Sequence, residues 1–258
     1  MEFGKQTLIV IKSDAEIDAM RPAGHLAYEM LEMLESFIKP GISTQDINDL
    51  VHKYTLKKGG TSAPLNYHGF PKSVCTSVNH VVCHGIPRKN QFLKDGDIIN
   101  VDVTPIINGY HGDSSRTYYV GENVSDSAKR LTECAKKCLE LGISVVQDGC
   151  RIGDIGHIIQ EYAESLGYGV VRSFVGHGIG KQFHEDPQIP HYGKKNRGLR
   201  LSKGMVFTIE PMINEKDFRC KVLKDEWTAI TYDGKLSAQF EHTLAIRHNG
   251  TVEILTKP

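Results

Sequence analysis

The feature of this 258-residue sequence that most constrains its fold is an internal echo at one fixed separation. The segment LKDG at 93–96 precedes an apolar run that ends in Asp102, and LSKG at 201–204 precedes one that ends in Glu210, 108 positions later in both cases. A third match has the same offset and pairs a glycine and an aspartate in each copy: Gly41 and Asp46 with Gly149 and Asp154. Three matches with one offset predict two related halves, about residues 13–120 and 121–258, fused into a single domain spanning 1–258.

Each half is expected to contain helices and antiparallel strands, so the chain belongs to the mixed α/β class of the α+β kind. Capping signals and helical spacing of apolar residues predict four helices, at 13–40, 43–59, 125–146 and 152–166. Pro22 should kink or restart the first of them. Strands are expected as a pair within 73–82 that turns at Asn79-His80, and then at 98–104, 110–120, 170–174, 205–210, 227–232 and 240–246.

Composition narrows the class of protein. The 31 basic and 31 acidic residues balance, so we expect no DNA partner and no anionic membrane partner. We expect no secretory signal, and the sequence contains no apolar run of membrane-spanning length. Six cysteines without a CxxC pair are typical of free thiols in a reducing compartment, so we expect a cytoplasmic protein, and a monomer by default.

The run 98–104 alternates apolar residues with Asn100, Asp102 and Thr104, which predicts a half-buried strand with a polar second face. Asn108-Gly109 is a strong signal for a two-residue hairpin turn. That turn places Asp102 opposite Ser115 and Thr104 opposite Asp113, so the two aspartates become diagonal neighbours on one face, roughly 7–8 Å apart at most. Two carboxylates so placed need a cation between them or a shared proton.

Three further residues complete a candidate metal site. His177 lies among glycines in GHGIG, Glu210 ends an apolar strand before a proline, and Glu241 precedes another apolar strand. Taken singly, each residue has an ordinary structural interpretation. Asp102 and Asp113 would be charged residues on a sheet face, Glu210 would end a strand, and His177 would be a buried histidine in the core. Together, carboxylates with one histidine form a hard, oxygen-rich set that suits manganese, iron, cobalt or zinc, and more than one ion.

Six segments then resemble the type I methionine aminopeptidases in order and spacing over nearly the whole chain: CHGIP (83–87), NVDVT (100–104), HGDSSR (111–116), GHGIGKQFHEDP (176–187), TIEPM (208–212) and QFEHT (239–243). The resemblance implies a pseudo-symmetric pita-bread fold, in which helices back a central, curved antiparallel sheet. It implies a single catalytic aminopeptidase domain with two divalent metal ions. The implied metal ligands are Asp102, Asp113, His177, Glu210 and Glu241.

The same resemblance implies the reaction: hydrolytic removal of the initiator methionine from nascent proteins whose second residue is small, with a dinuclear metal-bound hydroxide as nucleophile. His84 would contact the substrate amide, His184 would stabilise the oxyanion, and Glu210 would shuttle the proton. Five residues correspond to the apolar pocket for the methionine side chain: Tyr67, Phe70, Cys75, Phe183 and Trp227. Pro64 departs from the cysteine that many members carry there.

Two alternatives stay open at this stage. A prolidase or proline aminopeptidase shares the fold and the metal set, but usually carries a substantial extra N-terminal domain. A non-catalytic, peptide-binding pita-bread module typically loses metal ligands, whereas this chain matches all five. The basic stretch 194–203 is either a solvated loop or a weak contact with the ribosome, where nascent polypeptides emerge.

Overall fold

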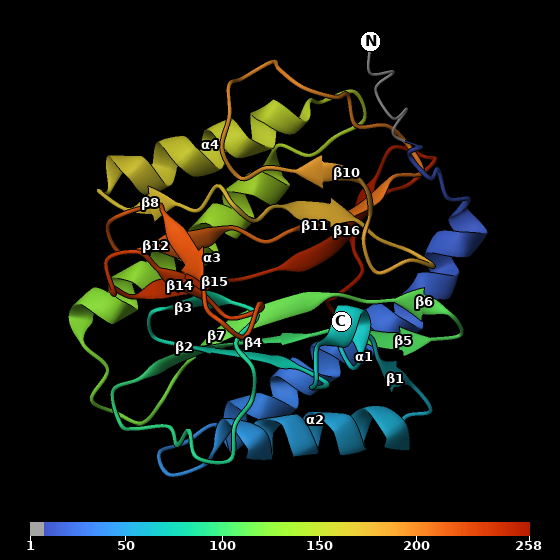
Figure 1. Cartoon of the computed structure of the whole chain (residues 1–258). Helices are drawn as coiled ribbons and strands as arrows, with labels where there is room; N and C mark the ends of the chain where they lie inside the picture. Colours follow the sequence, from blue (N-terminus) through green and yellow to red (C-terminus); the bar gives the residue numbers. More distant parts are fainter. Residues whose placement is uncertain (1–7) are drawn as a thin grey trace.

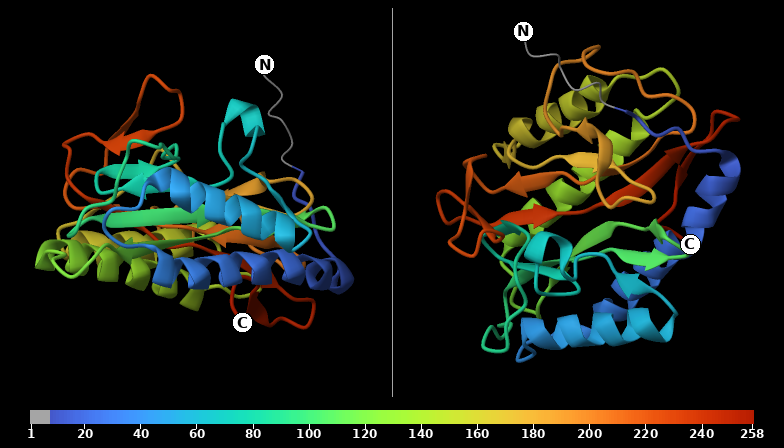
Figure 2. Two further views of the ribbon diagram at one scale, coloured as in Figure 1. Left: turned by 90° about the horizontal axis from the view of Figure 1, so that it is seen from below. Right: turned by 45° about the vertical axis from the view of Figure 1, so that its right-hand side comes forward.

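The computed structural model describes residues 8–258 as helices packed on one face of antiparallel strands (Figure 1). The helices are α1 (Asp14–Phe37), α2 (Thr44–Lys57), α3 (Asp126–Ser144) and α4 (Ile152–Ser165), with a short 3-10 turn, η1 (Tyr67–Gly69). Viewed from below, α1 and α3 lie on one side of the strands, and η1 projects from the other (Figure 2). Within the described residues, no helix has the length and apolar character needed to cross a membrane.

The strands of the first half are β1 (Thr61–Ser62), β2 (Cys75–Val78), β3 (Val81–Cys83), β4 (Ile98–Val103), β5 (Pro105–Ile107), β6 (Tyr110–His111) and β7 (Ser114–Tyr119). Those of the second are β8 (Gly169–Val170), β9 (Gly176–Gly178), β10 (Glu185–Ile189), β11 (Val206–Ile209), β12 (Met212–Asn214), β13 (Cys220–Val222), β14 (Ala229–Thr231), β15 (Ser237–Gln239), β16 (His242–Ile246) and β17 (Val252–Ile254). Two groups form the centre, β2-β4-β7 from the first half and β10-β9-β11-β16-β17 from the second.

The predicted helices are all present, and their ends follow from local chemistry. Ser13 caps α1 and exchanges hydrogen bonds with Glu16, and Ser43 does the same with Asp46 at α2. The prediction that Pro22 restarts the first helix is wrong, because α1 runs through it without a break. Proline removes one helical hydrogen bond. Met20 before it and Ala23 after it are both buried, so the packing of α1 against the core outweighs that loss.

The two strands within 73–82 are present with a turn at Asn79-His80, but the prediction that they pair with each other is wrong. β2 pairs with β4, and β3 pairs with β14. The reason lies in Asn79, whose backbone N–H donates to Ile98 and whose carbonyl accepts from Ser237. These bonds attach the turn to β4 on one side and to β15 on the other, so β2 and β3 do not pair with each other.

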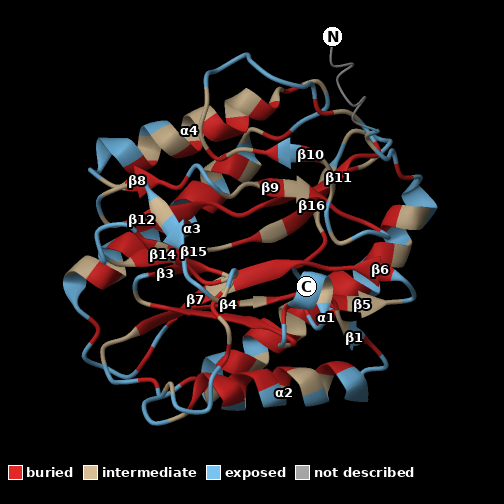
Figure 3. Ribbon diagram, in the orientation of Figure 1, coloured by how far each residue is buried: buried red, intermediate tan, exposed pale blue. Residues whose placement is uncertain are grey.

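Strand β4 is buried on both faces, which corrects the expectation of a half-buried strand. Ile99, Val101 and Val103 pack against the helices. Most of the polar face is buried as well (Figure 3). Asn100 donates to the carbonyl of Gln239 in the second half, and Thr104 is buried against Asp113. A polar face of this kind is an interface inside the molecule and not a solvent surface.

Other predicted strands are shorter than expected. The strand expected at 110–120 is divided into β6 and β7. At the break, Gly112 lies so close to α1 that an added Cβ would be 2.3 Å from the backbone of Ala23. The strand expected at 170–174 ends at Val170, and those at 205–210, 227–232 and 240–246 are trimmed to β11, β14 and β16.

Backbone bonds repeat at the 108-residue offset. The N–H of Gly41 donates to Leu93 O at 2.8 Å, and that of Gly149 donates to Leu201 O at 2.8 Å. Isolated bridges join Ser43 to Phe92 and Arg151 to Arg200 at the corresponding positions. Each half also has its own apolar core, one under α1 and α2 and the other under α3 and α4. The molecule therefore consists of two similar halves that meet along one line.

Candidate active site

One pocket of about 470 Å³ opens along the line where the halves meet. All of the residues singled out from the sequence line it: Tyr67, Phe70, Cys75, His84, Asp102, Asp113, His177, Phe183, His184, Glu210, Trp227 and Glu241. They come from eight separate stretches of chain, so the fold brings together groups that are up to 174 positions apart.

The hairpin register in the first half is as predicted. Ile107 pairs with Tyr110 across Asn108-Gly109, and Asp102 pairs with Ser115. Both turn residues have positive φ (52° and 79°), as this hairpin turn requires. Asp113 lies in the bend between β6 and β7, where the Thr104 hydroxyl donates to its carboxylate at 2.8 Å.

The second half supplies the other three ligand candidates at strand ends. His177 is in β9, Glu210 follows β11, and Glu241 precedes β16. The Nε2 atom of His177 lies 3.5 Å from Asp113 Oδ2 and 3.6 Å from Glu210 Oε1. One ligand atom each from Asp113, His177 and Glu241 lies within 4.8 Å of the other two, which is close enough for one cation to contact all three.

The site is electrostatically unbalanced without a cation. Burial, and then the charge of Asp113, raises the pKa of Asp102 and of Glu241 well above the usual range. Burial likewise raises the pKa of Glu210 to about 7. Asp102 Oδ1 is buried and has no hydrogen-bond partner among the described residues. A divalent ion would supply the missing positive charge and a partner for that oxygen.

His177 is oriented as a ligand. Its Nδ1 lies 2.9 Å from the carbonyl of Gly178 and can donate to it, which leaves the lone pair of Nε2 directed at the carboxylates. Burial alone would lower the pKa of His177, but the hydrogen bond to Asp113 and the charge of Glu210 outweigh it and raise the pKa. The Nε2 atom of His177, whose surroundings favour a bound proton, is therefore also suited to bind a metal ion.

Side-chain hydrogen bonds join the halves beside the site. The Thr243 hydroxyl donates to the carbonyl of Asp113 at 2.8 Å and accepts from its N–H at 3.2 Å. Asn100 donates to Gln239 O, and Ser114 donates to Glu241 O. Ligands from the two halves are thus fixed relative to one another by buried polar contacts.

Two histidines face the pocket without joining the acidic cluster. His84 has a positive φ of 55° and packs its ring edge against Phe174 and Trp227. The Nδ1 atom of His184 is hydrogen-bonded to the hydroxyl of Tyr67, 2.7 Å away. Burial in the pocket lowers the pKa of each to about 4, so both rings are neutral at pH 7. His184 as a whole residue is exposed, but its ring lines the pocket, where desolvation lowers its pKa.

Aromatic rings form the apolar end of the pocket. Phe70 meets Trp227 edge to face at 5.2 Å, and Tyr67 meets Phe183 in the same way at 5.0 Å. Cys75 is buried beside them. This end of the pocket is lined by apolar and polarizable groups, and the acidic cluster lies at the other end.

Some contributing residues were not expected. His191 is buried, and its Nε2 accepts from the N–H of Glu210 at 3.0 Å. Met212 and Phe174 also line the pocket. His111 stacks on Phe183 at 5.6 Å, in keeping with a supporting role. Spacing along the chain carries no signal for these contacts, since each depends on how distant strands pair.

The comparisons with known proteins agree with this geometry. Residues 18–248 match metallopeptidase family M24. Methionine aminopeptidase A of Synechocystis sp. is 58% identical, over 96% of this chain and 97% of that protein. The methionine aminopeptidase of Salmonella typhimurium is 49% identical, over 96% and 94%.

Among solved structures, the methionine aminopeptidase of Rickettsia prowazekii superposes with a TM-score of 0.94 at 48% identity, covering 97% of this chain and all of that one. The prolidase of Pyrococcus furiosus shares the fold at a TM-score of 0.73 and 22% identity. That match covers 96% of this chain but only 66% of the prolidase.

Proposed function

The chain belongs to the methionine aminopeptidases of metallopeptidase family M24, and from this premise we propose how its residues bind and cleave their substrate. It hydrolyses the peptide bond after an N-terminal methionine. The observation that carries the rest is the convergence of an acidic cluster, two neutral histidines and an aromatic cup in one pocket.

We infer that two divalent ions occupy the acidic end, held by Asp102, Asp113, His177, Glu210 and Glu241. Four carboxylates and one imidazole favour cobalt, manganese, iron or zinc. The unpartnered oxygen of Asp102 and the raised pKa values of Asp102 and Glu241 support this assignment. When bound, such ions activate water as the nucleophile and polarise the scissile carbonyl.

The aromatic cup takes the methionine side chain. Tyr67, Phe70, Cys75, Phe183 and Trp227 present soft, apolar walls to a thioether. The free α-amine then lies at the Asp102 end of the pocket, where its lone pair could bind a metal ion. A substrate with a chain extending in front of its methionine cannot place an amine there, which explains why the enzyme removes terminal residues.

Three side chains act on the reacting bond. The neutral ring of His84 accepts from the N–H of the second residue. The ring of His184, with Tyr67 donating to Nδ1, keeps its proton on Nε2 and donates it as a hydrogen bond to the developing oxyanion. Glu210, next to the Thr208 hydroxyl at 2.7 Å, carries the proton from water to the leaving amine.

The second substrate residue should be small, because His84 and the loops around it crowd the position beyond the scissile bond. Met-Ala and Met-Gly peptides should be cleaved much faster than Met-Leu or Met-Lys peptides. An assay of Met-Ala-Ser against X-Pro peptides, with bound metal measured in parallel, tests the assignment against a prolidase. Equal kcat/KM for Met-Ala-Ser and X-Pro would contradict it.

The substrates in the cell are nascent polypeptide N-termini, and the enzyme acts as a cytoplasmic monomer in this proposal. The stretch 194–203 supports a weak association with ribosomes. Lys194, Lys195, Arg197 and Arg200 are exposed there and lie outside the pocket, so they are free to contact phosphate. Co-sedimentation with ribosomes should weaken when these four residues are replaced by alanine, while cleavage of Met-Ala-Ser stays unchanged.

We further propose that the half-repeats run over about 13–120 and 121–258, within one catalytic domain. The hydrogen bonds and bridges that recur at the 108-residue offset support these bounds. Asp102 and Glu210 then occupy equivalent positions in the two halves. Separately produced halves should each fail to bind two ions, since each holds only part of the ligand set.

A further inference from the structure

Lys12, just before α1, buries its charged side chain. Its Nζ lies 2.7 Å from Glu185 Oε2, and only 4% of the lysine side chain and 7% of the glutamate side chain are exposed. Glu185 begins β10 and directly follows His184. A buried lysine therefore contacts the residue next to the proposed oxyanion donor.

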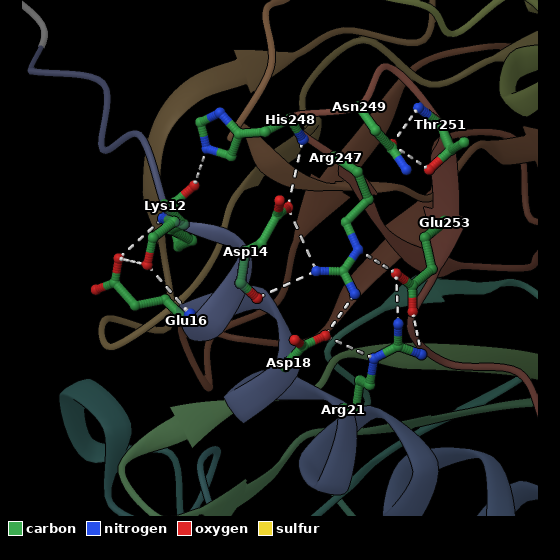
Figure 4. Close-up of polar contacts among 11 residues, drawn as sticks. Lys12, Asp14, Glu16, Asp18, Arg21, Arg247, His248, Asn249, Thr251 and Glu253 are labelled. Atoms are coloured by element: carbon green, nitrogen blue, oxygen red, sulfur yellow. Dashed lines mark hydrogen bonds and ion pairs between the residues drawn. The ribbon is translucent and has the colours of Figure 1, made fainter.

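The backbone of Lys12 is fixed from both sides. Its N–H donates to Gly204 O at 2.8 Å, and its carbonyl accepts from His248 Nε2 at 3.0 Å. Figure 4 shows His248 directed at that carbonyl. Next to it, Arg247 forms ion pairs with Asp14, Asp18 and Glu253. The lysine side chain thus extends from a backbone position that is hydrogen-bonded to the second half.

The turn that carries His184 is held on its pocket side by Tyr67, whose hydroxyl lies 2.7 Å from His184 Nδ1, and by the stacking of Phe183 on His111. Lys181, Gln182 and His184 are exposed, so packing alone holds them weakly. Glu185 uses both carboxylate oxygens at this turn, since Oε1 accepts from the N–H of Gln182 at 3.2 Å and Oε2 binds Lys12. Lysine, glutamate and turn form one connected unit.

Glycine at the start of the turn fits the same arrangement. A Cβ added to Gly180 would lie 2.4 Å from Lys12 Cε and 2.7 Å from Glu185 Oε1. The lysine side chain therefore crosses the backbone of Gly180 and reaches Glu185 at the other end. It contacts both ends of the turn.

We propose that Lys12 is a positioning residue for catalysis, which holds the ring of His184 in place through Glu185. This rests on the proposed function of His184. A buried ion pair contributes little net stability compared with apolar residues of similar size, so its value lies in the geometry that it imposes. A turn that shifts by about 1 Å can cost on the order of 100-fold in rate.

The test compares kcat, KM for Met-Ala-Ser and bound metal in Lys12→Met, Lys12→Arg and Ser13→Ala. Lys12→Met should lower kcat about 10- to 100-fold, with KM changed less than about 3-fold and metal content unchanged. Lys12→Arg, which keeps the charge, should recover most of kcat. Ser13→Ala removes the neighbouring cap of α1 without touching the turn, and should leave kcat unchanged.

Lys12→Met leaves the buried carboxylate of Glu185 without its cationic partner, which threatens folding. The pair Lys12→Met with Glu185→Gln removes that charge and keeps an acceptor for Gln182. This double variant should be as stable as the wild type and still have the low kcat. A double variant with normal kcat would overturn the proposal.

A cycle with His184→Ala identifies the route of the effect. If Lys12 acts through His184, Lys12→Met should lower kcat no further in the His184→Ala background. A full additional loss there, with His184→Ala itself impaired, would overturn the role of Lys12 and leave that of His184 intact. A His184→Ala variant with near-normal kcat would overturn both.

Discussion

Thr243→Val tests whether the contact between the halves determines the geometry of the site. Thr243 is completely buried and supplies both hydrogen bonds that the backbone of Asp113 makes within residues 8–258. Valine has nearly the same shape but can neither donate nor accept. The substitution therefore leaves a buried N–H and a buried carbonyl without partners.

The magnitude follows from those two groups. Each buried polar group left unsatisfied costs about 1–3 kcal/mol, so we expect the free energy of unfolding to fall by about 2–6 kcal/mol. Because Asp113 also moves, kcat for Met-Ala-Ser should fall at least about 10-fold. Urea denaturation followed by the fluorescence of Trp227, the single tryptophan, measures the first quantity.

Thr132→Val is the matched control. Thr132 is also buried, but its hydroxyl donates to Ala128 O within α3, a carbonyl that keeps its helical partner. The control should cost less than about 1 kcal/mol and leave kcat unchanged. If Thr243→Val comes within about 0.5 kcal/mol of the control, or keeps normal kcat, the reasoning is refuted.

Three further outcomes are expected. Trp227→Ala should mainly weaken the preference for methionine over leucine at the first position, and an unchanged ratio of kcat/KM values would remove Trp227 from the cup. Glu210→Gln should keep the wild-type circular dichroism but lose about 100-fold or more in kcat, because an amide cannot carry the proton; near-normal turnover would contradict that role. The Ser43 hydroxyl and N–H hold the pKa of Asp46 below 3.8, so its stabilisation is present above about pH 4 and is lost as pH falls through the lowered value. The stability difference between wild type and Asp46→Asn should therefore shrink from pH 5 to pH 3, and a difference independent of pH would be inconsistent with this cap.

The part of the fold that the sequence determines is local. Ser13 and Ser43 cap helices wherever those helices pack, because the bonds they make lie within four residues. Asn108-Gly109 sets the hairpin register that places Asp102 opposite Ser115, since its positive φ angles select one turn. The 108-residue echo likewise indicated two similar halves. The ligand set came from resemblance to a family, on motifs that can be read without coordinates.

Only the tertiary structure decided which distant segments meet. It separated β2 from β3, buried the polar face of β4, and placed His191 behind Glu210. Lys12 is a buried partner of Glu185 only because residues 173 positions apart meet. Local propensity acts over a few residues, whereas burial and long-range pairing depend on the whole chain, so these contacts have no signature in the sequence.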